Sequence, residues 1–69
     1  MKTIFKRLGT ITERYSGINE MNIDVLFVSH TYVRIYDKSK QCNNDYIVDK
    51  VMIDCTEKNP IQIVYLKDV

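Results

Sequence analysis

Hydrophobic residues at the start of the chain recur at the spacing of an α-helix. The positions that share one side of a helical projection are Ile4, Phe5, Leu8, Ile11 and Tyr15. The opposite side carries no large apolar residue. Thr3 can cap the beginning of such a helix, and Gly17 stands where a left-handed C-terminal residue is favoured. This pattern predicts an amphipathic helix over residues 3–15.

Two features of the same segment favour a pair of strands instead. Gly9 would cost about 1 kcal/mol in a helix interior, and residues 10–12 form a β-branched run, Thr-Ile-Thr. The strand pair therefore stays open as the alternative for residues 3–15.

The hydrophobic period changes to two after residue 20. Apolar residues alternate with polar ones over 21–25 and continue as an apolar run over 25–28, which predicts a strand that is covered on both faces at its far end, and His30 marks a bend. Residues 31–37 then read as a second strand. The stretch 37–45 is polar apart from Cys42 and predicts a loop.

The last third of the chain predicts two further strands around one turn. Residues 46–53 would also suit one face of a helix, but their β-branched content favours a strand. A turn over 56–60 precedes a final strand at 61–66. Together these elements predict one domain over 1–69 of the α+β class, with one N-terminal helix packed on a small, mainly antiparallel sheet of about four strands. The alternative is an all-β small barrel or meander.

Composition and charge narrow the range of functions. The net charge is +1 over 69 residues, whereas nucleic-acid or anionic-membrane binding usually needs a stronger basic bias. The predicted helix nevertheless has a basic face formed by Lys6, Arg7 and Arg14. Such a face could follow a phosphate backbone, although most faces of this kind are simply solvated.

Residues suited to catalysis or metal binding are sparse. There are one histidine, two cysteines and two glycines, too few for a structural zinc site or a glycine-rich phosphate loop. Ser29 and His30 are adjacent, but adjacency supplies neither a strained nucleophile turn nor an oxyanion site. We therefore expect no enzyme activity, no catalytic residues, no metal and no cofactor. Cys42 and Cys55 are expected to be reduced in a cytoplasm, and no apolar run is long enough to span a membrane.

The predicted strand 31–37 carries the best candidate binding surface. If Val33 and Ile35 face the core, then Tyr32, Arg34 and Tyr36 point outward. Tyrosine and arginine are enriched among the residues that dominate protein interfaces. The plainer interpretation is a cross-strand ladder in which Arg34 reaches a carboxylate.

These observations favour a small, non-enzymatic protein-binding module. Richness in Ile, Lys, Asn and Tyr with no Ala indicates a low-GC gene, and a phage or mobile-element inhibitor that occludes a host protein, acting as a host-defence antagonist, would suit such a gene. Self-association as a homodimer belongs to the same class of function. The alternatives are nucleic-acid binding through tyrosine stacking and the basic helix face, and an oligomer that captures a small anionic ligand.

Overall fold

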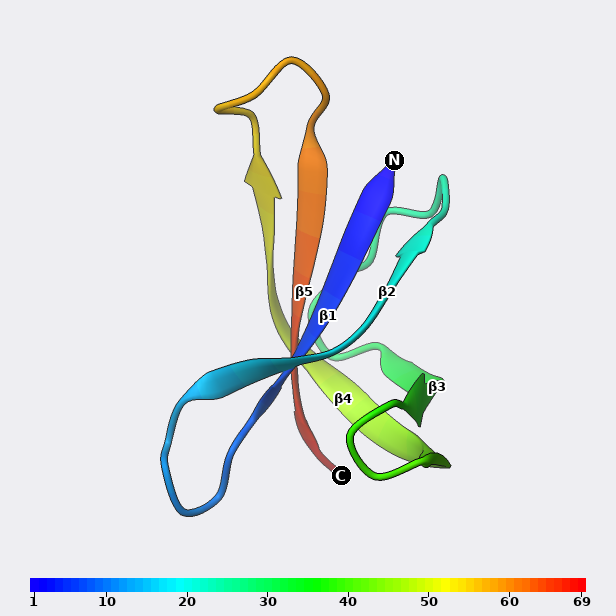
Figure 1. The fold of residues 1–69 in the computed structure, drawn as a ribbon, viewed down its shortest axis with the longest axis vertical. Helices are drawn as coiled ribbons and strands as arrows, with labels where there is room; N and C mark the ends of the chain where they lie inside the picture. Colours follow the sequence, from blue (N-terminus) through cyan, green and yellow to red (C-terminus); the bar gives the residue numbers. More distant parts are fainter.

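The chain folds into five β-strands and contains no helix (Figure 1). The computed structural model describes residues 1–69. The strands are β1 (Lys2–Leu8), β2 (Tyr15–Asn22), β3 (Tyr32–Asp37), β4 (Cys42–Asp54) and β5 (Ile61–Asp68). The predicted α+β class with its N-terminal helix is therefore wrong, and the protein is all-β. No helix with the length and apolar character needed to cross a membrane is present.

All five strands belong to one sheet with the order β2-β1-β5-β4-β3. The central pair, β1 and β5, is parallel, and the other neighbours are antiparallel. The sheet curls into a half-barrel, so its two edge strands meet at one end. There the Lys38 N–H donates to the Ile18 carbonyl at 3.0 Å, and the Asn19 amide donates to the Tyr36 carbonyl at 2.9 Å.

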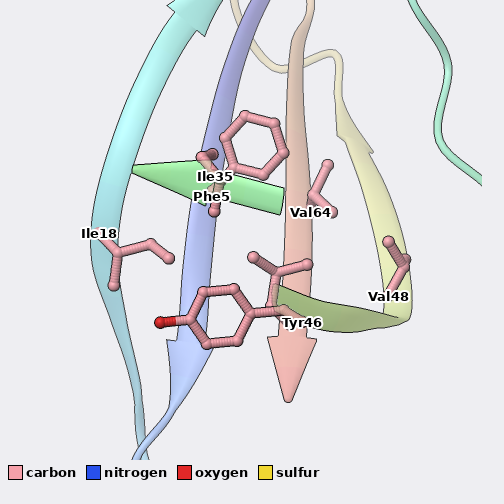
Figure 2. Packing of buried hydrophobic residues seen from close by; sticks show 7 residues of the cluster. Phe5, Ile18, Ile35, Tyr46, Val48 and Val64 are labelled. Atoms are coloured by element: carbon pink, nitrogen blue, oxygen red, sulfur yellow. The ribbon is translucent and has the colours of Figure 1, made fainter. Parts of the chain in front are cut away.

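The core lies on the concave face of this curled sheet (Figure 2). Strand alternation sends every second side chain to that face. Its buried apolar members are Phe5, Ile18, Ile35, Tyr46, Val48, Val64 and Leu66. Each of the five strands contributes at least one of these residues, so the core joins all five strands into one unit.

A segment without regular structure, residues 23–31, covers the open side of the concave face. The buried Gln62 side chain on β5 holds it, donating to the Val25 carbonyl at 2.8 Å and accepting from the Phe27 N–H at 3.0 Å. Its amide also donates to the Thr3 hydroxyl at 3.0 Å. The Phe27 ring packs edge-on against Phe5, with centroids 5.4 Å apart. Residues 21–28 are thus not a strand beyond Asn22, which corrects the sequence prediction.

The predicted helix over 3–15 is instead a β-hairpin made of β1, β2 and the turn between them. Gly9 donates to the Arg14 carbonyl at 2.8 Å, and the Glu13 N–H donates to the Gly9 carbonyl at 3.0 Å. Glu13 takes a left-handed φ of 54°. Ile11, which the helix would have buried, lies at the hairpin tip with 94% of its surface exposed.

The remaining strand boundaries are closer to the sequence prediction. β3 and β5 lie where alternation placed them, and residues 46–53 lie within strand β4. The predicted loop over 37–45 is too long, because β4 begins at Cys42. A tight turn over 38–41 suffices, with Gln41 at a φ of 55° and the Asp37 carboxylate accepting from the Ser39 and Lys40 N–H groups.

Candidate functional site

The outward row of β3 is the most exposed set of aromatic and cationic side chains on one strand. Ile35 is buried and Val33 is half-buried on the concave side. Tyr32, Arg34 and Tyr36 consequently point away from the core, and Tyr32 keeps 69% of its surface exposed. The three side chains lie where alternation placed them. Whether they bind a partner stays a prediction.

Arg34 is fixed in position by a carboxylate on the neighbouring strand. It faces Asp45 across the β3–β4 ladder and makes a two-pronged ion pair, with Nε–Oδ1 at 2.6 Å and Nη2–Oδ2 at 3.2 Å. These hydrogen bonds raise the pKa of Arg34 and lower the pKa of the Asp45 carboxyl. Both groups are exposed, so the pair adds little stability. Its consequence is a guanidinium group that is held beside Asp45 and still largely exposed.

The backbone of β3 has one edge without a neighbouring strand. The Val48 N–H donates to the Thr31 carbonyl, so the odd-numbered residues of β3 are the ones that bond to β4. The even-numbered residues direct their N–H and C=O groups to the opposite edge. The bonds at Tyr36 and Lys38 agree with this parity, because both reach across to β2.

Only the first half of that edge is open. At its C-terminal end β3 is covered by Ile18 and Asn19 of β2. Around Tyr32 and Arg34 no backbone bond from β2 or from residues 23–31 reaches the edge. The side chains of Tyr32 and Arg34 also line a shallow hollow of about 360 Å³, which extends over Asp45 of β4 to Val69, the residue that follows β5.

Asp45 and Val69 are members of this surface that sequence reasoning missed. Asp45 was placed in a loop, where it has no strand neighbour. A shorter loop would have revealed the pairing. A turn over residues 38–41 brings residue 37 opposite residue 42, and the antiparallel register that follows brings residue 34 opposite residue 45. Val69 carried no signal, since its place beside Asp45 follows from the register of the antiparallel β4–β5 pair, which a bulge between Val48 and Lys50 shifts.

A second hollow lies at the other end of the sheet, between residues 23–31 and the β4–β5 turn. This groove has a volume of about 1000 Å³, and its apolar lining comes from Met1, Leu26, Ile53, Pro60 and Ile61. Lys2, Asn22, Glu57 and Asn59 form its polar rim. No buried charged or polar side chain points into it, so the groove has no feature that would orient a ligand.

The outer face of the central strands carries a closed aromatic and charged network. The rings of Tyr15 and Tyr65 meet edge-on at 4.7 Å, and the Lys50 ammonium lies 5.1 Å from the Tyr65 centroid. The Tyr15 hydroxyl donates to Asp49 at 2.8 Å, and Lys67 pairs with the same carboxylate at 3.1 Å. The hydrogen bond to Asp49 raises the pKa of Tyr15. The polar groups of this network bond to one another, so the network is a weaker candidate for binding than β3.

The three residues of the predicted basic helix face do not form a common surface. Lys6 lies on the outer face of β1 opposite Tyr65, whereas Arg14 is in the exposed hairpin turn. Arg7 is largely buried, and its Nε lies 3.8 Å from the Asp37 carboxylate. Because the helix does not exist, this stripe is a wrong prediction.

Chemistry-bearing residues are dispersed in the fold. Cys42 and Cys55 are both free and exposed, and no three side chains among His, Cys, Asp and Glu come together as metal ligands would. Comparison with protein-family models, curated proteins and solved structures found no match for this chain.

Proposed function

We propose that this chain is a small protein-binding module, without catalytic function, that recognises another polypeptide through β3. One observation carries the proposal: Tyr32, Arg34 and Tyr36 stand exposed on a strand whose first half also has an open backbone edge. Side chains and backbone thus offer two kinds of recognition at the same place.

The physical basis of the proposal is the low cost of ordering this surface. Tyrosine offers a large apolar area with few rotatable bonds, and an arginine held by Asp45 has already lost much of its freedom. An extended segment added to a sheet edge gains main-chain hydrogen bonds, while alternate side chains supply specificity. A 69-residue half-barrel with this surface would act by covering a partner, not by transforming it.

The biological setting that fits the proposal is an inhibitor from a phage or mobile element, acting on a host protein in the cytoplasm. Support for this setting comes from the amino-acid composition alone. Nucleic-acid binding is not proposed, because the basic helix face on which it depended is absent and Arg7 faces Asp37 instead. Capture of a small anionic ligand is not proposed either, because Arg7 and Arg34 each already face a carboxylate.

Affinity capture with matched variants tests the proposal. The wild-type chain, a Tyr32→Ala/Arg34→Ala double variant and a Met52→Ala control would each be immobilised and exposed to lysate of a low-GC bacterium. Met52 is also exposed on the outer face of the sheet, but on the distal part of β4. We expect proteins retained by the wild type and the control to be lost by the double variant. Identical retention by all three folded chains would exclude β3 as the binding surface.

A further inference from the structure

We infer that the polypeptide that pairs with the open edge of β3 is a second copy of this chain, in a symmetric antiparallel ladder centred on Val33. The inference rests on the proposed function, because it names the occupant of the same edge. The two half-barrels would then share one continuous sheet of ten strands.

The open part of β3 lacks the features by which proteins usually protect a sheet edge. Those features are prolines, lysines, bulges or a covering segment. Residues 32–35 contain no proline or lysine, and the β3–β4 register runs without a bulge. The one charge, Arg34, is already neutralised by Asp45. The outward N–H and C=O groups of the open part of β3 are therefore free to form a ladder with any strand that presents unpaired backbone groups.

Strand geometry leaves few registers for such a ladder. The outward backbone groups belong to even-numbered residues, so an even-numbered residue must face an even-numbered residue of the second copy. A ladder that extended over Tyr36 would collide with β2, which covers that end. The axis must therefore lie between Tyr32 and Arg34.

Side-chain pairing then selects the register centred on Val33. In it Tyr32 faces Arg34 of the second copy, and the symmetry makes this pair twice. The tyrosine ring can lie against the face of the guanidinium while the guanidinium edge keeps its bonds to Asp45. An axis at Arg34 would place two guanidinium groups opposite each other, and an axis at Tyr32 would place Arg34 opposite His30.

The surroundings of Val33 fit the centre of a small interface. Val33 would face itself in a non-hydrogen-bonded pair, in which side chains lie close together. The two Val33 side chains would thus meet on the concave face of the shared sheet, and the two tyrosine–arginine pairs would lie on its outer face.

Sedimentation equilibrium of the purified chain over a range of concentrations tests the inference. We expect a monomer–dimer equilibrium. Tyr32→Lys puts a cation opposite Arg34 of the second copy and should raise the dimer dissociation constant at least about tenfold, equivalent to about 1.4 kcal/mol. Tyr32→Glu puts a carboxylate there and should keep the dimer. Met52→Lys adds the same charge away from the edge and should leave the equilibrium unchanged.

Hydrogen exchange provides the second readout. The amides of Tyr32 and Arg34 point to the open edge and should become protected as concentration rises, whereas those of Val33 and Ile35 already bond to β4 and should not change. A chain that stays monomeric at all concentrations would overturn the inference, as would a dimer that tolerates Tyr32→Lys. If that monomer still retained partners in a manner dependent on Tyr32 and Arg34, the proposed function would stand and only the second copy would be excluded.

Discussion

At the scale of single residues, Asp37 is the most heavily used side chain. It is fully buried, yet its carboxylate accepts from the Tyr46 hydroxyl at 2.9 Å and from the turn amides of Ser39 and Lys40. Burial would raise its pKa, but these hydrogen bonds outweigh burial and lower it. The ionised form is therefore the one that the fold holds, with the Arg7 guanidinium nearby.

Replacing Asp37 with Ala should destabilise the protein strongly. The change leaves the buried Tyr46 hydroxyl without an acceptor and Arg7 without a counter-charge, at a cost of about 3 kcal/mol. For a domain whose whole stability is roughly 3–10 kcal/mol, that is a large fraction. Urea unfolding followed by circular dichroism measures the loss. Asp45→Ala is the control, since its pair with Arg34 is exposed and screened by solvent, so its loss should change the stability far less. Equal losses in the two variants would contradict this account.

At the scale of elements, the β1–β2 hairpin shows how a helical spacing can mislead. Ile4, Phe5 and Leu8 have helical spacing, but only Phe5 is fully buried, because in a strand Ile4 and Leu8 point to the other face. Ile18 supplies the buried position on β2, at a bulge opposite Phe5 and Lys6. The hairpin thus enters the core through residues that a helix would not have combined.

A pair of alanine variants distinguishes the hairpin from the helix. Ile11→Ala should change the free energy of unfolding by no more than about 0.5 kcal/mol, because the side chain is exposed at the tip. Ile18→Ala should cost about 2–5 kcal/mol, because it leaves a cavity in the core. Thermal unfolding of both variants gives the comparison. A large loss for Ile11→Ala with little for Ile18→Ala would favour the helix.

How far the sequence predicted each element depended on whether its evidence was local. β3 and β5 were predicted, because clean alternation and flanking turns lie within each segment. The outward row of β3 followed from the same alternation. The hairpin stood only as the alternative, because the helical spacing of Ile4, Phe5 and Leu8 favoured a helix over the strand pair. The parallel pairing of β1 with β5 could not be predicted, because it joins residues as far apart as Lys2 and Ile61. The open edge was equally invisible, since it depends on which strands become neighbours.

At the scale of the whole molecule, buried polar groups connect the strands of the half-barrel with one another and with the segment that covers the core. Gln62 fastens residues 23–31 across the open side of the core. At the end where β2 and β3 meet, Asp37 links β3 to Tyr46 on β4 and lies near Arg7 on β1. A buried hydrogen-bonded network costs more when partly broken than an apolar contact does, so these groups hold the curl in one arrangement.

This dependence on buried polar groups predicts a loss of stability at both ends of the pH scale. The pKa of Asp37 is lowered in the fold, so its contribution is present above the unfolded pKa and is lost as the pH falls below about 5. Burial and the bond to Asp37 raise the pKa of Tyr46 from 10.0 to about 12. Its contribution, up to about 3 kcal/mol, is therefore present below pH 10 and is lost as the pH rises toward 12. Urea unfolding across the pH range should show a plateau between these limits. Tyr46→Phe should flatten the alkaline decline and Asp37→Asn the acid one, and a stability independent of pH in the wild type would contradict the role of both groups.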